Sequence, residues 1–432
     1  MVCKRVTKRI ALVCAVLILI LGMCGFTQAG VRLVLMGWED DYNPRSYYQA
    51  VKALFEKKNP GIEVVIKTVP YDGYVQKLLV EYAAGAGPDV FMSTSSWLGQ
   101  FSRNKAVLAI DGYVTREVLG DYPTSLVNAN TRDGKLYALP LVIYPGPQMI
   151  YNKRLFAEAG INPPTDHPWT YQEFIDNMVK LNRFDGSGRQ TRFALYTYFW
   201  ELWPMMWGAS FADDPVNPKR FNYTTPEMMD GLQAYIDLHT KYKILIGSRD
   251  IDALQLGKTQ LFLQEKVAAI LDCWYVGASL RGAPLEWGIA WPPMGPKNNV
   301  VQVGFDKSFM IMASTKHPDA AAKLAMFLNC DPESVGAYMN AVGGNVYDPF
   351  MPARKSVARS KAFLESGRLP MNKNMLVQMG EFARYWPDPS FGGEQWWMDF
   401  RQVLPKVIAG KGTLKEEMES LQSKHNKLLE EE

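Results

Sequence analysis

Residues 85–92 have the sequence GAGPDVFM, a glycine-rich turn that enters an apolar strand, and this stretch decides the fold. Two complete strand–helix units precede it, with their apolar strands at 31–36 and 62–69. Strands and helices that alternate at this length predict a parallel sheet covered by helices. In such sheets, the loops that leave the carboxyl ends of the strands line the ligand crevice. The sequence therefore predicts an α/β fold with a binding site at one edge of the sheet.

Two of these loops combine aromatic side chains with hydrogen-bonding groups. Residues 37–42 (GWEDDY) follow the first strand, and residues 93–97 (STSSW) follow the third. Pockets for small molecules are typically built from apolar and aromatic walls with a few well-placed polar groups. We therefore expect these two loops to hold a small polar molecule.

The amino terminus has the layout of a secretory signal peptide. Four basic side chains precede an apolar run over 10–21, and the sequence TQA at 27–29 offers a small-residue cleavage site. The apolar run is short for a membrane span of about 20 residues. We expect residues 1–29 to be a cleaved signal peptide and the protein to be exported to the periplasm. A lipid anchor at Cys24, on the outer face of the membrane, is the alternative.

The composition of the remaining chain argues against several classes of partner. The full sequence carries 47 Lys and Arg against 44 Asp and Glu, and four of the basic residues lie in the signal segment. A chain so close to neutral has no electrostatic reason to bind nucleic acid or an acidic membrane surface. Its four histidines show no metal-ligand spacing. We therefore expect no nucleic-acid partner, no metal and no cofactor.

Several short motifs occur in the order and spacing of a known family. In chain order they are 59–64 (NPGIEV), 87–90 (GPDV), 133–140 (DGKLYALP), 151–156 (YNKRLF), 292–296 (PPMGP) and 314–321 (STKHPDAA). With these motifs the chain resembles the extracytoplasmic solute-binding proteins of ABC importers, specifically the maltose-binding-protein-like group (family 1), which mostly carries sugars. The resemblance covers nearly all of the chain after the signal segment.

This resemblance implies an α/β, two-lobed periplasmic-binding-protein fold (class II-like) with discontinuous lobes and three hinge crossovers. The expected N-terminal lobe comprises 30–141 and 291–345, and the expected C-terminal lobe comprises 142–290 and 346–432. The expected crossings lie near 141–144, 288–291 and 343–347. Glycine and proline residues flank each of them, as they do in most long loops.

The resemblance also implies a function. A neutral sugar is held by aromatic rings that stack on its C–H faces and by polar side chains that bind its hydroxyl groups. A ligand that contacts both lobes shifts the hinge equilibrium towards the closed form, which the permease subunits of an ABC transporter would recognise. We expect a monomeric binding protein and not an enzyme. The number of aromatic residues favours an oligosaccharide.

Twelve candidate ligand-binding residues come from segments that match those which contact ligand in the family. They are Trp38, Asp40, Ser93, Ser96, Trp97, Tyr144, Tyr198, Trp200, Trp274, Asp306, Trp396 and Trp397. Trp274 and Trp397 are the expected stacking platforms. For Trp97, Trp200 and Trp396, packing in the core stays open as the alternative. Asp40 and Asp306, the latter expected just after a strand, have turn capping or pairing with a cation such as Lys307 as the alternative.

Two other functions stay open. A phosphorylated polyol such as glycerol phosphate would require arginine, lysine or open helix N-termini in the cleft, whereas the cleft loops carry almost no basic residue besides Lys307. A secreted glycoside hydrolase would require two carboxyl groups about 5–10 Å apart, for which Glu201 and Glu394 are the candidates.

The two cysteines outside the signal segment give a further expectation. Cys273 and Cys330 fall in different lobes of the implied fold, and a bridge between them would lock the lobes together. A disulfide also requires Cα atoms within about 7 Å of each other. We therefore predict two buried free thiols.

Overall fold

The computed structural model describes residues 30–431, except 41–42, 215–217, 274–275, 281, 298–299, 344–349, 369–371, 382 and 386–392. The expected signal peptide and the alternative anchor at Cys24 therefore lie outside the described residues. Within the described part of the chain, no helix combines the length and the apolar character that a membrane span requires.

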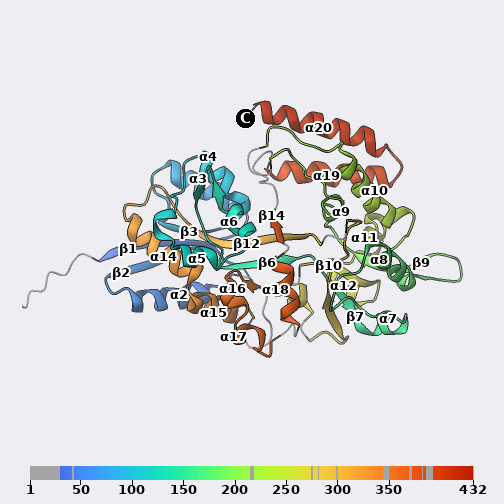
Figure 1. Ribbon diagram of the computed structural model, residues 1–432, viewed down its shortest axis with the longest axis horizontal. Coiled ribbons are helices and arrows are strands. Elements are labelled where there is room, and N and C mark those ends of the chain that lie inside the picture. Colours follow the sequence, from blue (N-terminus) through green and yellow to red (C-terminus); the bar gives the residue numbers. More distant parts are fainter. Residues whose placement is uncertain are drawn as a thin grey trace, which may run out of the picture.

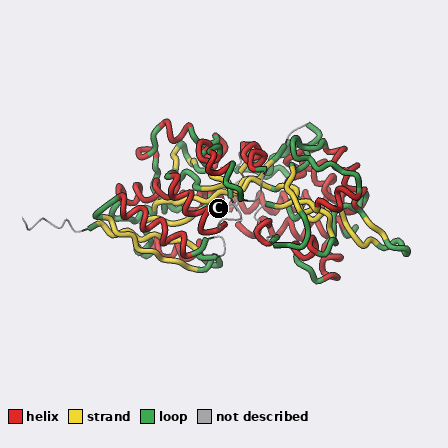
Figure 2. The backbone as a smooth tube through the Cα atoms, turned by 90° about the horizontal axis from the view of Figure 1, so that it is seen from below, coloured by secondary structure: helices red, strands yellow, loops and turns green. Residues whose placement is uncertain are grey.

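Two lobes lie side by side along the long axis of the molecule, each built around its own β-sheet (Figures 1 and 2). Among the described residues, the first lobe has a seven-stranded sheet in the order β13-β6-β12-β3-β1-β2, with β14 beside β12. Its strands are β1 (Val31–Trp38), β2 (Ile62–Val69), β3 (Val90–Ser93), β6 (Val142–Gly146), β12 (Gln302–Ile311), β13 (Met351–Pro352) and β14 (Ala383–Tyr385).

The described part of the second lobe has a five-stranded sheet in the order β11-β7-β10-β9-β8. Its strands are β7 (Gln148–Asn152), β8 (Arg183–Phe184), β9 (Gln190–Tyr196), β10 (Val267–Asp272) and β11 (Trp287–Ala290). A separate small hairpin in the first lobe joins β4 (Thr131–Arg132) to β5 (Lys135–Leu136).

Helices surround both sheets. Those of the first lobe are α2 (Arg45–Lys58), α3 (Tyr74–Ala83), η1 (Ser95–Trp97), α4 (Leu98–Arg103), η2 (Asp111–Tyr113), α5 (Arg116–Gly120), α6 (Thr124–Ala129), α14 (Pro318–Cys330), α15 (Pro332–Gly343), α16 (Lys355–Ala358), α17 (Lys361–Leu364) and α18 (Lys373–Glu381). Those of the second lobe are α7 (Lys153–Glu158), α8 (Tyr171–Met178), η3 (Val179–Leu181), α9 (Leu202–Met206), α10 (Pro226–Thr240), α11 (Ser248–Leu254), α12 (Lys258–Leu263), α13 (Val276–Ser279), α19 (Gly393–Ile408) and α20 (Leu414–Glu431).

The predicted parallel start of the first sheet is confirmed. β1 pairs in parallel with β2 along its whole length, from Val31 opposite Ile62 to Trp38 opposite Val69. It also pairs in parallel with β3. α3 is followed by Gly85 at φ +66°, a backbone conformation that favours glycine and ends the helix before the third strand. The carboxyl ends of these three strands therefore meet at one edge of the sheet.

The chain passes between the lobes three times. It leaves the first sheet after β6, returns between β11 and β12, and leaves again between β14 and α19. β6 and β12 consequently lie at the waist of the molecule (Figure 1). The third passage follows β14, later in the chain than the expected crossing at 343–347, most of which lies outside the described residues.

Strand pairing and packing also differ from the expected lobe boundaries. β6 and β13 were expected in the C-terminal lobe, but β6 pairs with β12, and Met351 of β13 pairs with Ile143 of β6. Met351, Leu376 and Met379 are buried in the core of the first lobe. These contacts join segments far apart in sequence, so no local pattern of residues indicates them.

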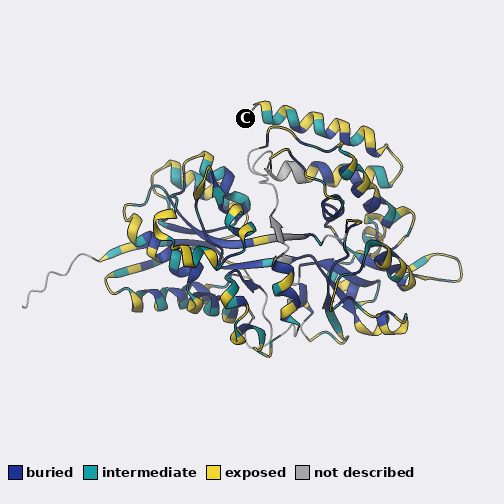
Figure 3. Ribbon diagram, viewed as in Figure 1, coloured by how far each residue is buried: buried dark blue, intermediate teal, exposed yellow. Residues whose placement is uncertain are grey.

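Buried apolar side chains form two clusters. Figure 3 shows in dark blue that buried residues follow the sheets of both lobes. The first fills the first lobe and continues across the waist to Ile150 and Ile270 of the second sheet. The second fills the remainder of the second lobe, where α20 packs against α19 and α10. Because the first cluster spans the waist, the lobes are joined by apolar packing as well as by the connecting strands.

Candidate functional site

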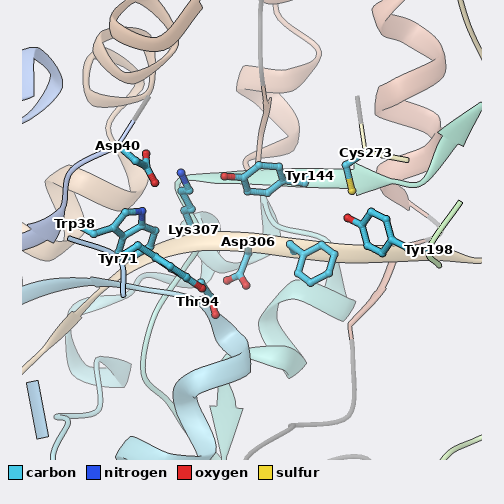
Figure 4. A pocket seen from close by; sticks show the side chains of 10 residues that line it. Trp38, Asp40, Tyr71, Thr94, Tyr144, Tyr198, Cys273, Asp306 and Lys307 are labelled. Carbon is cyan, nitrogen blue, oxygen red and sulfur yellow. The ribbon is translucent and has the colours of Figure 1, made fainter. Parts of the chain in front are cut away.

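A cavity of about 330 Å³ lies between the two lobes (Figure 4). This volume is within the range of pockets that hold small molecules. Its walls come from the carboxyl ends of the first-lobe strands, from the two waist strands and from the second lobe. The lining residues are Trp38, Asp40, Tyr71, Thr94, Tyr144, Tyr198, Cys273, Phe305, Asp306 and Lys307. Five of the twelve sequence candidates are thus brought together: Trp38, Asp40, Tyr144, Tyr198 and Asp306.

An aromatic cluster forms the first-lobe wall. The ring of Trp38, at the end of β1, lies edge-on to Tyr71 and Trp97, with centroid distances of 5.5 Å to each, and to Tyr74 at 5.3 Å. Trp38 is only 3% exposed, whereas Tyr71 is 54% exposed. Tyr71 therefore offers the most accessible aromatic surface of this wall, and the other rings hold it in place.

Asp306 lines the cavity but is occupied by protein donors. The sequence predicted Asp306 just after a strand, but it lies within β12. Its Oδ1 accepts hydrogen bonds from the backbone N–H of Ser95 at 2.9 Å and from the Ser95 hydroxyl at 2.6 Å. Its Oδ2 accepts from the Asn130 side chain at 3.2 Å. Burial raises the pKa of the carboxyl group. Asp306 thus attaches the turn at Ser95, which leads to Trp97, to the waist strand β12.

Ser93, Ser96 and Trp97 are not among the residues that line the cavity, although the Trp97 ring packs in the aromatic cluster. Ser93 is fully buried and pairs through its backbone with Ser308 of β12. The hydroxyl group of Ser96 is hydrogen-bonded to that of Thr94, which does line the cavity. These residues therefore position the wall.

Lys307 is the basic group of the cavity. Its Nζ donates to Asn43 Oδ1 and to the Tyr338 hydroxyl, each at 2.7 Å. It also lies over four aromatic rings at 4.9–5.6 Å from their centroids: Trp38, Tyr144, Tyr338 and Phe350. Burial lowers the pKa of Lys307 to about 7, against a smaller opposing effect of Asp40.

The second lobe contributes Tyr198 and Cys273. The Tyr198 ring is 38% exposed and stacks on Phe199 at 4.3 Å. Its hydroxyl donates to Asp272 Oδ1 at 3.4 Å, and Asp272 also accepts from Lys258 at 2.6 Å. Burial raises the pKa of Asp272, and Lys258 opposes that rise. The ring of Tyr198 is thus held facing the cavity by Asp272, the buried member of an ion pair with the partly exposed Lys258.

The remaining tryptophan candidates are placed elsewhere or not described. Trp200 is buried in the second-lobe core, stacked on Phe400 with ring centroids 4.4 Å apart. It borders a separate cavity of about 780 Å³ on that lobe, which shares Tyr198 with the first. Trp274 and the side chains of Trp396 and Trp397 lie outside the described residues.

The carboxylates proposed for a hydrolase do not form a described pair. Glu201 is 3% exposed and absent from the walls of both cavities, and burial raises its pKa to about 8. The side chain of Glu394 lies outside the described residues. The predicted free thiols are confirmed, since Cys273 and Cys330 are both buried and unbridged.

Sequence reasoning did not choose four aromatic or polar lining residues as ligand-binding candidates, although it named Lys307 as a basic residue of the cleft loops. Tyr71 follows the second parallel strand, so the rule that selected the loops after the first and third strands would also have found it. Thr94 lies inside a selected loop. Phe305 and Lys307 belong to β12, whose place at the waist depends on pairing with β6, which no local pattern reveals.

Comparisons with known proteins agree with this architecture. A family model described as bacterial extracellular solute-binding protein matches residues 40–329. The galactooligosaccharide-binding protein of Bacillus subtilis is 24% identical over 426 residues, covering 94% of each chain. A maltooligosaccharide ABC transporter solute-binding lipoprotein of Streptococcus pneumoniae is 26% identical over 300 residues, covering 67% of this chain and 66% of the relative. The structure of a cyclic alpha-maltosyl-1,6-maltose binding protein from Arthrobacter globiformis superposes with a TM-score of 0.77 at 20% identity, over 93% of this chain and 100% of that one, which shows a shared fold.

Proposed function

Because this chain belongs to the family of bacterial extracellular solute-binding proteins, we propose that it is the carbohydrate-binding component of an ABC transporter. It captures a neutral sugar between its two lobes and delivers it to a membrane permease. It acts as a monomer, without a cofactor, and it is not an enzyme. It works in the periplasm after cleavage of the signal peptide between Ala29 and Gly30, with a lipid anchor at Cys24 as the alternative.

The observation that carries this proposal is the composition of the cavity between the lobes. Exposed aromatic rings come from both sides, with Tyr71 and Phe305 on the first lobe and waist and Tyr198 on the second. Asp40, Thr94 and Lys307 add acceptors and donors. Aromatic faces together with a few polar groups suit the C–H faces and hydroxyl groups of a sugar.

The placement of these groups supports binding by closure. A sugar that contacts Tyr71 and Tyr198 together makes its full set of contacts only when the lobes are close. Its binding therefore favours the closed form in proportion to the difference in affinity between the two forms. Relatives named for galactooligosaccharides and maltooligosaccharides favour an oligosaccharide as the ligand.

A phosphorylated polyol is the second candidate ligand, favoured by the presence of Lys307 in the cavity wall. A phosphate group is usually bound by several donors or cations. Among the lining residues of the described cavity, Lys307 is the only cation, and Asp40 lies in the same wall. The neutral sugar is therefore the better match.

A thermal-shift screen of residues 30–432 tests the proposal. The probes are maltotriose, a galactooligosaccharide, glucose and glycerol 3-phosphate. A ligand at about 100 times its Kd adds about 2.7 kcal/mol to the free energy of unfolding. A shift with a neutral sugar, reduced in Tyr71→Ala, is the expected result. The matched control is Phe184→Ala, which removes a 50% exposed ring from β8, away from the cavity.

The other outcomes each contradict a part of the proposal. A shift with glycerol 3-phosphate alone would replace the neutral sugar by a phosphorylated polyol. The disappearance of the sugar during prolonged incubation would indicate a hydrolase. An equal loss of binding in Phe184→Ala and Tyr71→Ala would remove the assignment of the site to this cavity.

A further inference from the structure

Lys307 occupies an unusual position in the cavity between the lobes. It projects from β12, the strand that returns from the second lobe, and is only 4% exposed, yet it lines the cavity. Figure 4 shows its side chain rising from that strand among Trp38, Asp40 and Tyr144. A buried ammonium group at a ligand-binding surface must be compensated by its surroundings in each state of the protein.

Among the described groups around Lys307, neutral ones provide most of that compensation. The two hydrogen-bond acceptors at 2.7 Å are an amide oxygen, from Asn43, and a hydroxyl group, from Tyr338. The aromatic rings around Nζ add cation–π attraction, which is stronger in a dry site. Asn43 also donates to Asp40 Oδ1 at 2.7 Å, so the amide connects the carboxylate to the ammonium group. Neutral partners stabilise the charge less than a buried carboxylate would.

The titratable groups around Lys307 come from four elements. Asp40 follows β1, and its charge favours protonation of Lys307. Tyr338 of α15 has a pKa raised by burial and is neutral near pH 7. Tyr144 of β6 presents its ring to Lys307. Asp306, the preceding residue of β12, is bonded to Ser95 and Asn130. Among the described neighbours, Asp40 is the one whose negative charge acts on Lys307.

We propose that Lys307 is a specificity-determining residue of this site, whose protonated amine donates a hydrogen bond to an oxygen of the bound sugar, so that binding weakens as the solution becomes alkaline. This inference rests on the proposed function. When the lobes close, water leaves the cavity, and a ligand oxygen takes its place beside the ammonium group. A ligand group without an acceptor at this position would leave the buried charge poorly compensated.

The direction of the pH effect follows from linkage. Burial brings the pKa of Lys307 to about 7, and a ligand that accepts from the ammonium form raises that pKa further. Binding then takes up a proton at any pH between the two values. The affinity is therefore highest below about pH 7 and falls above it by at most about tenfold per pH unit.

Isothermal titration calorimetry with maltotriose and with a galactooligosaccharide, from about pH 6 to about pH 9, tests this dependence. We expect the wild-type affinity to fall above about pH 7, with proton uptake visible as a dependence of the heat on the buffer. Lys307→Met should bind more weakly at about pH 6 and show a flat pH profile. The matched control is Lys373→Met, which removes a lysine that is 2% exposed in α18 and does not line the cavity. It should keep the wild-type profile.

A second measurement does not depend on the stability of that variant. In wild-type protein with ¹³C-labelled lysine, the NMR signal of the Lys307 side chain should titrate near neutral pH, and its midpoint should rise when sugar is added. Lys307→Arg assigns the signal, because the signal is absent from that variant.

The outcomes separate the inference from the function on which it rests. Sugar binding with the same affinity across the pH range, or a Lys307 midpoint that sugar does not move, overturns the role of Lys307 and leaves the binding function intact. The absence of binding to either sugar at every pH overturns the proposed function, and this inference with it.

Discussion

Asp306 connects the waist strand to the loop that builds the first-lobe wall. Asp306→Ala would leave the Ser95 N–H, the Ser95 hydroxyl and the Asn130 amide without their acceptor. Each buried group left unsatisfied costs about 1–3 kcal/mol. We expect a lower free energy of unfolding in urea, together with weaker sugar binding because the turn that carries Trp97 loses its anchor.

Asp306→Asn is the conservative comparison. The amide keeps one acceptor oxygen, so it should retain part of the stability and of the affinity. A variant that loses stability but binds sugar with unchanged affinity would show that the turn is held in place without Asp306.

Glu201 is a buried carboxyl group whose ionisation should make the stability of the protein depend on pH. Burial raises its pKa to about 8, from a usual value near 4.5. The folded protein therefore binds more protons at this group than the unfolded chain does between those values, so its contribution to the free energy of unfolding falls as the pH rises through that window. Glu201→Gln, which cannot ionise, should be increasingly stable relative to wild type from about pH 5 to about pH 8, by an amount on the order of a few kcal/mol.

Urea unfolding at several pH values measures the effect. Glu419→Gln, at an exposed position of α20, is the control and should show no such trend. A difference between Glu201→Gln and wild type that does not change with pH would mean that Glu201 stays ionised in the folded protein.

The sequence predicted those residues of the cavity wall that directly follow a locally recognisable strand. Trp38 and Asp40 were found because they follow an apolar strand whose parallel partners could be identified from the sequence. Trp200, by contrast, has the same chemistry as a ligand platform, and only its packing on Phe400 places it in the core. Side-chain type alone does not separate these cases, because ligand stacking and core packing use the same apolar surface.

At the scale of secondary-structure elements, the waist strand β6 brings the first lobe into contact with the second-lobe wall of the cavity. β6 ends at Gly146, and a Cβ atom at this position would lie 2.7 Å from Cys273 Sγ. The glycine therefore allows the first-lobe strand to pass directly against the second-lobe wall. Gly146→Ala should displace Cys273 and weaken sugar binding, at a cost of about 1–3 kcal/mol for overpacking.

A double-mutant cycle isolates this contact. Cys273→Ala removes the sulfur, so Gly146→Ala should cost less in the Cys273→Ala background than in wild type, both in free energy of unfolding and in sugar affinity. Strictly additive effects would mean that the glycine is needed for another reason.

The sequence predicted the pairing of strands that are close together in the chain, but not the pairing of strands that are far apart. The parallel pairing of β1, β2 and β3 followed from alternating strands and helices, since each connection is local. The pairing of β13 with β6 and of β14 with β12 joins residues separated by long stretches of chain. For this reason the third passage between the lobes was expected earlier in the chain, and Phe305 and Lys307 were not chosen as ligand-binding residues.

For the whole molecule, the arrangement of two lobes around one cavity predicts a change of shape with ligand. Tyr71 and Tyr198 face the cavity from opposite lobes (Figure 4). The connections between the lobes pass through the waist (Figure 1). A ligand that contacts both rings stabilises the closed arrangement by its difference in affinity for the two forms, and hinge movements of this kind are a common response of two-lobed proteins. The radius of gyration measured by small-angle X-ray scattering should therefore decrease when a binding sugar is added at saturation.

The variants distinguish closure from binding alone. Tyr198→Ala removes the second-lobe ring but leaves the first-lobe wall of Trp38 and Tyr71 in place. It should bind sugar more weakly, and at saturation it should show a smaller decrease in the radius of gyration than wild type, because the sugar then gains less from the closed form. The same decrease in both proteins would mean that contacts other than Tyr198 drive closure. If calorimetry shows saturation while scattering shows no change in wild type, the free protein already has the closed shape, and the sugar enters without movement of the lobes.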